Sequence, residues 1–251
     1  MNGKLFLVPT PLDFGCGTQT SLEQVLPAQT IRVAAKLSCW LCENAKTTRA
    51  FLKRVQQIVP LSIPMQALDI RPLPHGAGNR GDSMSAADAA AMLQPALSGI
   101  DIGLISEAGM PAVADPGQAI VRAAHELAIP VIPLIGPASM LLALAGSGLN
   151  GQNFAFVGYL PVASAAREQR IRELETWSLK TGQTQQFIEV PYRNAAMLAS
   201  LLKVLQPGTQ LSVACGLTLE QQQIRSGSVA NWRVRQASMR LESPAIFSIG
   251  L

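Results

Sequence analysis

The stretch DIGLISEAGMPAVADPG, residues 101–117, decides the fold of the N-terminal half of the chain. Residues 102–105 are apolar, which is typical of a buried strand, and the segment after Gly117 has apolar residues at helical spacing. The stretch therefore joins a strand to a helix. We expect Asp115 to cap that helix and Pro116 to occupy its first position.

The connection itself, from Ser106 onward, has features of a ligand-binding loop. Gly109 allows the backbone to approach a ligand or to adopt a positive φ, and Pro111 stiffens the turn. Ligands of open parallel sheets bind outside the carboxyl ends of the strands, which is where this loop lies. An ordinary strand-to-helix connection is the alternative interpretation.

Strand and helix patterns alternate through the first half of the chain, which favours a parallel sheet with helices on both faces. The predicted strands are residues 5–11, 31–42, 101–108 and 129–136, and the predicted helices are 22–27, 46–59, 85–97 and 117–128. Ser85 and Asp88 resemble a capping box at the start of the third helix.

A different order follows Gly136 and indicates a second domain with a mixed or antiparallel sheet. Its predicted strands are residues 154–160, 184–190, 210–217 and 244–250, and its predicted helices are 137–148, 165–177 and 194–205. We place the domains at residues 1–134 and 135–251 and assign both to the α/β class.

Composition limits the function only loosely. The chain has 251 residues, 48% of them hydrophobic, enough for two modest cores. Twenty Lys and Arg against 16 Asp and Glu give a net charge of +4, which permits a polyanionic partner without requiring one. No apolar run approaches the length of a membrane span or a signal-peptide core, so we expect a cytoplasmic protein without membrane contact.

The cysteines and glycines do not define a metal or dinucleotide site. Cys39 and Cys42 have the spacing of a redox or zinc pair, but Cys16 and Cys215 stand alone. We therefore predict buried structural thiols and no metal. The sequence after Gly15 lacks the third glycine of a dinucleotide fingerprint, which leaves a nicotinamide dehydrogenase poorly supported. We expect the second of the two histidines, His125, on a helix surface.

Four separated segments together resemble the tetrapyrrole-methylase superfamily of S-adenosylmethionine (SAM)-dependent methyltransferases. They are LFLVPTPL (residues 5–12), the loop at 106–117, PVIPLIGPASMLLALAGSGL (130–149) and FAFVGYLP (154–161). Within the superfamily the chain is most similar to the branch of ribosomal RNA small-subunit methyltransferase I, which methylates a cytidine ribose 2′-hydroxyl. The resemblance implies two α/β domains, SAM in the cleft between them, a homodimer and an RNA substrate.

The resemblance also implies which residues contact the cofactor. The matching positions are Pro9, Thr10, Pro11, Ser106, Glu107, Ala108, Gly109, Met110, Val113, Gly136, Pro137, Ala138, Ser139, Leu217, Pro244 and Ala245. Glu107 stands where relatives usually have Asp, and it can accept from a ribose hydroxyl or an amino group. Ser139 and amides at a helix start can hold the carboxylate of SAM.

Methylation of a ribose hydroxyl benefits from a base or from a cation that stabilises an alkoxide. The candidate catalytic residues are Glu43, Lys46 and Glu189. The chain departs from the branch at several charged positions: it has ENAK at 43–46 for EDTR, GLTL at 216–219 for ELTK, and a His-rich loop reduced to residues 74–76. Lys cannot form the bidentate phosphate contact of Arg.

These departures leave three functions open. The first is a SAM-dependent methyltransferase acting on ribosomal or similar RNA. The second is a methylase of a tetrapyrrole precursor, although the N-terminal motif lacks the Gly-x-Gly-x-Gly-Asp pattern of those relatives. The third is a SAM-binding protein without catalysis.

Basic residues form three clusters that can meet RNA phosphates, with a solvated helix face as the alternative for each. They are Lys46, Arg49 and Lys53; Arg167, Arg170 and Arg172; and Arg233, Arg235 and Arg240. Aromatic residues make up only 5% of the chain and do not alternate with these clusters. We therefore expect no platform for stacking single-stranded bases.

Overall fold

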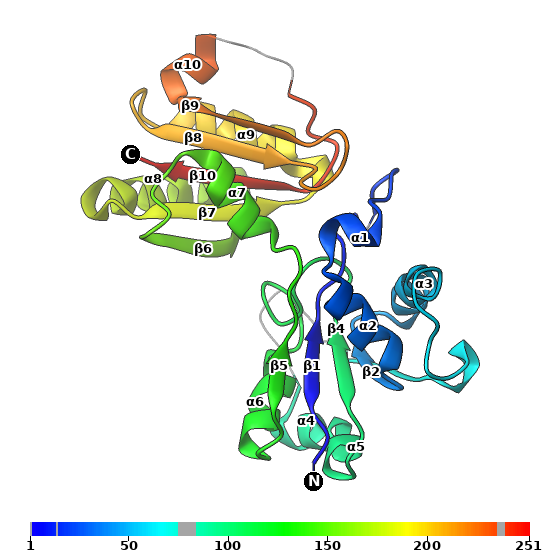
Figure 1. Cartoon of the computed structure of the whole chain (residues 1–251). Helices are drawn as coiled ribbons and strands as arrows, with labels where there is room; N and C mark the ends of the chain where they lie inside the picture. The colour runs from blue at the N-terminus through cyan, green and yellow to red at the C-terminus, as the bar shows by residue number, and fades with distance from the viewer. Residues whose placement is uncertain (1, 14, 75–83, 235–238) are drawn as a thin grey trace. The chain divides into compact units, whose positions relative to one another are not determined.

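The computed structural model describes residues 2–13, 15–74, 84–234 and 239–251 (Figure 1). The chain divides into two compact units. The N-terminal unit comprises Met1–Gly15 and Gln19–Pro137, and the C-terminal unit comprises Cys16–Thr18 and Ala138–Leu251.

The N-terminal unit contains an all-parallel sheet in the order β3-β2-β4-β1-β5. Its strands are β1 (Leu5–Val8), β2 (Cys39–Cys42), β3 (Asp69–Pro72), β4 (Ile102–Ile105) and β5 (Val131–Pro133). The connecting helices are α1 (Leu22–Val25), α2 (Ala28–Lys36), α3 (Ala45–Gln56), the 3-10 helix η1 (Met65–Ala67), α4 (Ala86–Met92), α5 (Gln94–Leu97) and α6 (Gln118–Glu126).

Helices cover both faces of this sheet, and a separate apolar cluster lies under each layer. Ala89 of α4 and Ile120 of α6 are buried in one cluster. Ile31 of α2 and Leu52 of α3 are buried in the other. Parallel strands require such crossovers, and the predicted parallel α/β domain is confirmed.

Three local predictions for this unit are wrong. Residues 31–36 form the end of helix α2, and the strand begins only at Cys39. Ile31, Ala34 and Ala35 are buried at helical spacing. The β-branched residues of the same segment are typical of strands, which is why the helical period was not recognised. The short edge strand β3 was not predicted, because its four residues are exposed or half-exposed and show no apolar pattern.

The third error concerns the start of α6, which begins at Gln118 with Gly117 as the N-cap. Gly117 has φ 128°, which only glycine adopts readily, and a Cβ there would lie 2.9 Å from Leu104 Cδ2. Asp115 and Pro116 therefore belong to the loop and not to the helix. By contrast, the predicted cap at Ser85 is confirmed, since its hydroxyl accepts the Asp88 N–H at 3.1 Å.

The C-terminal unit contains a mixed sheet in the order β6-β7-β10-β8-β9, as predicted. Its strands are β6 (Phe154–Tyr159), β7 (Thr184–Glu189), β8 (Gln210–Cys215), β9 (Gln223–Ser228) and β10 (Ala245–Gly250). Its helices are α7 (Ser139–Ser147), α8 (Ser164–Thr181), α9 (Pro191–Val204) and α10 (Val229–Val234). Strands β6 and β7 are parallel, and the remaining pairs are antiparallel.

Successive side chains of β7 point to opposite faces of the sheet, and different helices pack on the two faces. Phe187 stacks on Phe247 of β10 with ring centroids 5.8 Å apart, in the apolar cluster that contains residues of α8 and α9. The neighbouring Gln186 points to the other face, where its amide donates to the Met140 carbonyl of α7 at 3.2 Å. The sheet is therefore covered on both sides.

Cys39, Cys42 and Cys215 are buried and free, as predicted, and Cys16 is half-buried. Burial, followed by the charge of Asp69, raises the pKa of the Cys39 thiol to about 11, so it is protonated and unreactive at neutral pH. Within the described ranges no group of His, Cys, Asp and Glu is arranged to hold a metal ion. None of the helices in those ranges has the length and apolar character needed to cross a membrane.

Candidate functional site

Segments from three adjacent strands meet at the carboxyl edge of the N-terminal sheet. Strand β1 continues into Pro9, Thr10 and Pro11, β2 into Glu43, and β4 into the loop at 106–117. Thr10 and Gly109 form an isolated antiparallel bridge, with N–H to O distances of 2.9 and 3.1 Å. The structure therefore joins two of the segments predicted to bind the cofactor.

Glu43 is attached to the same loop. Its N–H donates to the Ile105 carbonyl at 3.3 Å, and its Oε2 accepts the Glu107 N–H at 3.2 Å. This contact follows from the strand register, in which Cys42 pairs with Ile105 and the next residues lie side by side. A predicted catalytic carboxylate and a predicted cofactor residue are thus neighbours.

Three carboxylates gather here, and Asp115 is the one that sequence reasoning missed. The pKa of Asp115 is raised to about 7, first by burial and then by the negative charges of Glu43 and Glu107, while the nearby Ser106 side chain opposes the shift. In addition, Glu107 Oε1 is a buried oxygen without a hydrogen-bond partner among the described residues. A ligand that carries hydrogen-bond donors fits this arrangement.

Gly109 sits in this loop at φ +78°. A Cβ at this position would lie 3.1 Å from Leu12 Cδ2, closer than ordinary contact. The glycine therefore allows the loop to turn and to pair with Thr10. Of the two reasons expected for this glycine, the structure confirms the positive φ.

We predict that Gly109→Val lowers the free energy of unfolding by about 1–3 kcal/mol, because a β-branched residue is strained at positive φ. The loop must then leave its bridge with Thr10, and SAM binding should be lost. Calorimetric titration with SAM and urea unfolding measure the two effects. Gly151→Val is the matched control, since nothing lies within 4 Å of a Cβ there. Unchanged SAM affinity in the Gly109 variant contradicts the placement of the cofactor.

The segment before α7 also contacts the β1 extension. A Cβ on Gly136 would lie 2.3 Å from Cγ of Pro9, so the two segments touch at a position where only glycine fits. Pro137 is buried, and its carbonyl lies 3.6 Å from the Cβ position of Gly109. Ala138 is the N-cap of α7, and Ser139 is its first residue.

Other predicted cofactor residues differ in exposure. Ser106 of the loop is buried, Ala108 and Met110 are half-buried, and Val113 is exposed. In the C-terminal unit Leu217 and Ala245 are buried and Pro244 is exposed. The buried side chains can contribute to a site through their backbone groups.

Lys46 is the second residue of helix α3, and its side chain is exposed. Its N–H donates to Oδ1 of the N-cap Asn44 at 2.9 Å. Asn44 therefore caps the helix at the position where the sequence EDTR has Asp. Arg49 and Lys53 are exposed on the same helix. Arg235 of the third basic cluster, with His75 and Gly76 of the shortened loop, lies outside the described residues.

Glu189 lies at the end of β7 in the C-terminal unit and is only 2% exposed. Its Oε1 accepts the Val190 N–H at 2.8 Å and the Arg193 Nε at 2.8 Å, and Arg193 Nη2 lies 2.6 Å away. The carboxylate is therefore held in a buried ion pair that fixes the start of α9. This geometry favours a positioning role over that of a general base.

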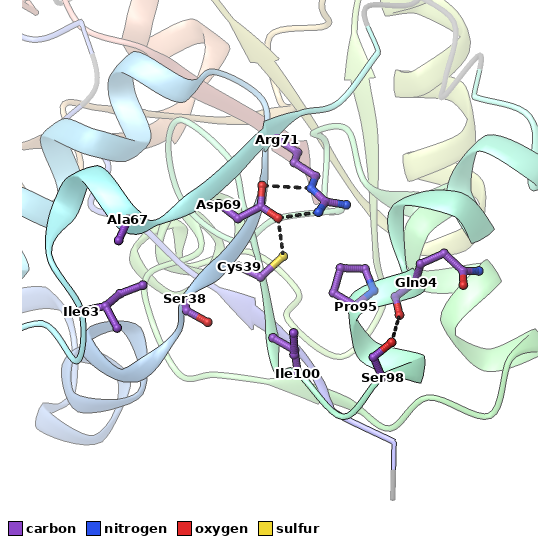
Figure 2. A pocket seen from close by; sticks show the side chains of 10 residues that line it. All are labelled: Ser38, Cys39, Ile63, Ala67, Asp69, Arg71, Gln94, Pro95, Ser98 and Ile100. Carbon is purple, nitrogen blue, oxygen red and sulfur yellow. Dashed lines mark hydrogen bonds and ion pairs between the residues drawn. The ribbon is translucent and has the colours of Figure 1, made fainter.

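A pocket of about 590 Å³ lies at the opposite end of the N-terminal sheet, beside the first residues of β2 and β3 (Figure 2). Asp69 accepts from Arg71 Nε at 3.0 Å and from the Cys39 thiol at 3.8 Å, and the three side chains converge in Figure 2. None of the predicted site residues lines this pocket. It is separate from the carboxyl edge where the loop lies.

The parallel and mixed sheets together define a two-unit α/β fold of the kind found in tetrapyrrole methyltransferases. The methyltransferase CobJ has a TM-score of 0.57 at 18% identity, covering 99% of this chain and 94% of CobJ. Uroporphyrin-III-C-methyltransferase from Thermus thermophilus has a TM-score of 0.52 at 18% identity, covering 100% of this chain and 93% of the other. At these identities the likeness establishes the fold alone.

Residues 29–232 match the family described as Tetrapyrrole (Corrin/Porphyrin) Methylases, and the chain belongs to that family. Ribosomal RNA small subunit methyltransferase I of Vibrio cholerae is 37% identical over 122 residues, 49% of this chain and 41% of the relative. The protein of that name from Mesorhizobium japonicum is 30% identical over 226 residues, 90% of this chain and 67% of the relative. The first of these matches spans less than half of the relative's length.

Proposed function

We propose that the protein is a SAM-dependent methyltransferase that acts on RNA, with ribose 2′-O-methylation of ribosomal RNA or a related reaction as its activity. The observation that carries the proposal is the edge where the β1 extension, Glu43 and the 106–117 loop are joined by hydrogen bonds. Membership of the methylase family and the names of the relatives support it.

The proposed cofactor contacts remain those inferred from the sequence, and the proposed domains remain residues 1–134 and 135–251. Bound SAM supplies a methyl group on a positively charged sulfonium. The unpartnered Glu107 Oε1 can accept from the amino group or a ribose hydroxyl of the cofactor. The bridge between Thr10 and Gly109 holds the loop ready, which reduces the ordering that binding requires.

For the acceptor RNA, Glu43 is the proposed general base, because its carboxylate is fixed against the loop. Lys46 is exposed at the start of α3 and can contact a phosphate next to the acceptor ribose. Glu189 is proposed to act through Arg193, whose position it fixes. We also propose a homodimer and a cytoplasmic location, in keeping with ribosomal RNA as the substrate.

Two alternatives retain support from particular observations. The chain belongs to a family described as Tetrapyrrole (Corrin/Porphyrin) Methylases, which favours a tetrapyrrole precursor as the substrate. The sequence GLTL at 216–219, which lacks the charges of the relatives, favours SAM binding without catalysis.

Titration with SAM and with NAD separates these possibilities at the cofactor. We expect heat of binding from SAM and none from NAD, and the reverse result would end the methylase interpretation. Label transfer from SAM to small ribosomal subunits of a strain lacking the gene then tests the substrate. Label in RNA supports the proposal, label only in a uroporphyrin-type acceptor supports the second function, and binding without turnover supports the third.

A further inference from the structure

The two tyrosines of the chain lie at the same edge of the C-terminal sheet. Tyr159 ends β6 and pairs in register with Ile188 of the parallel strand β7, while Tyr192 lies in the first turn of α9, directly after β7. Their side chains are 55% and 85% exposed. Val162, which is 66% exposed, follows Tyr159 by three residues. Exposed apolar groups therefore gather on neighbouring segments.

A fixed guanidinium lies beside the more exposed ring. Arg193 Cζ is 6.0 Å from the ring centroid of Tyr192, at the limit of a cation–π contact. The buried Glu189 holds this guanidinium through two nitrogens, so its position does not depend on a ligand. The ring and its cation are thus ordered in advance.

A second cation at this edge is anchored without a carboxylate. Arg167 of α8 donates to the Val162 carbonyl and to the Ser200 hydroxyl of α9, each at 3.0 Å. It forms no ion pair with any described residue. No carboxylate of the described residues therefore neutralises its positive charge.

The acids of the same elements are paired with cations or buried. Glu173 of α8 is paired with Arg170, and Glu175 is buried and accepts from the Gln206 N–H and the Thr209 hydroxyl. Glu189 is buried and paired with Arg193, and Glu168 of α8 is paired with Lys203 and Arg172.

Tyr192 presents an exposed ring at the start of α9, and the adjacent helix α8 presents Arg167, a cation without an ion pair among the described residues. This combination complements an unpaired base and a phosphate of the same strand. An acidic peptide would use the charge but would not need a flat exposed ring.

We propose that Tyr192 stacks on an unpaired base of the RNA substrate and that Arg167 contacts a neighbouring phosphate. The inference rests on the proposed function and names how that substrate is held. It replaces the expectation that the chain has no stacking residue: the sequence separates Tyr192 from the Arg167 cluster by 25 positions, and the fold brings α8 and α9 together.

The test measures binding of a fluorescein-labelled single-stranded fragment of small-subunit ribosomal RNA by anisotropy. Tyr192→Ala should raise Kd about 5- to 100-fold, the range found for loss of one stacked base. Tyr192→Phe keeps the ring and should stay within about twofold of the wild type. Both variants should bind SAM with unchanged affinity, because Tyr192 is not among the proposed cofactor contacts.

Two further variants separate stacking and charge from general surface effects. Trp177→Ala removes another exposed aromatic ring of the same unit, one that donates to Gln183, and should leave RNA binding unchanged. Arg167→Gln should lower the magnitude of the slope of log K against log salt by about 0.7, the value for one phosphate contact of single-stranded RNA.

The outcomes distinguish the inference from the function on which it rests. If the wild type does not bind the RNA, the proposed substrate is wrong and the inference fails with it. If the wild type binds and Tyr192→Ala binds equally well, only the inference is overturned. Equal weakening by Tyr192→Phe and Tyr192→Ala also overturns it, since the ring would then not be the group that matters.

Discussion

Replacing Arg193 with Ala is expected to lower the free energy of unfolding by about 3–5 kcal/mol, the cost of leaving a buried charge without its partner. Glu189 is 2% exposed, and Arg193 provides two nitrogens to its Oε1. Without the guanidinium, the Val190 N–H is the donor to this oxygen that remains among the described residues. Urea unfolding of the full chain measures the loss.

The matched control is a second Arg–Glu pair on a helix of the same unit. Arg170 Nη1 lies 3.1 Å from Glu173 Oε2, but both side chains are more than 40% exposed. Arg170→Ala should therefore change the free energy of unfolding by no more than about 0.5 kcal/mol. Similar losses in the two variants would show that burial of Glu189 does not decide the effect.

A double variant tests the physical reason. In Glu189→Gln/Arg193→Ala the buried charge is removed together with its partner, so part of the lost stability should return relative to Arg193→Ala alone. Gln keeps an oxygen that can accept the Val190 N–H. A double variant as unstable as the sum of the two single variants contradicts a direct interaction between these side chains.

The parallel domain could be predicted because its strands end in loops rich in Gly and Pro and alternate with helices. Helix α2 could not, since the helical period of Ile31, Ala34 and Ala35 is short and runs into the buried strand at Cys39. Strand β3 gave no signal because an edge strand needs little apolar surface. Local patterns fail where tertiary packing, and not propensity, selects the element.

The site could be predicted only in part, for a related reason. The loop was identified from its own residues, but the contact between Glu43 and Glu107 depends on β2 and β4 being adjacent, an order that the chain sequence does not state. Asp115 was interpreted as a cap because Asp-Pro is typical of a helix start. Its position beside Glu43 appears only when the loop is folded.

Replacing Asp115 with Asn is expected to make the protein more stable at pH 8, and the gain should shrink as the pH falls. The pKa of Asp115 is raised from 3.8 to about 7 in the folded protein, so the folded state binds this proton more tightly than the unfolded chain. Stability from this group is complete below pH 3.8 and is lost as the pH rises through 7. Asn resembles the protonated acid and does not titrate.

At a pH where the folded state holds the Asp115 proton and the unfolded chain does not, the free energy of unfolding changes by about 1.4 kcal/mol per pH unit. Between pH 5 and pH 8 the difference in unfolding free energy between Asp115→Asn and the wild type should therefore grow by about 2–3 kcal/mol. Urea unfolding at each pH measures it, and subtracting the two proteins cancels the other titrating groups. A difference that does not change with pH contradicts the raised pKa.

Glu43→Gln tests whether the charge of Glu43 contributes to the raised pKa of Asp115. The charge of Glu43 is the largest contribution to the Asp115 pKa after burial, ahead of the opposing hydrogen bond of Ser106 and the charge of Glu107. Removing that charge should lower the pKa of Asp115 while burial keeps it above 3.8, so the pH at which stability is lost should move down. Carboxyl carbon NMR titration of Asp115 reads the shift directly.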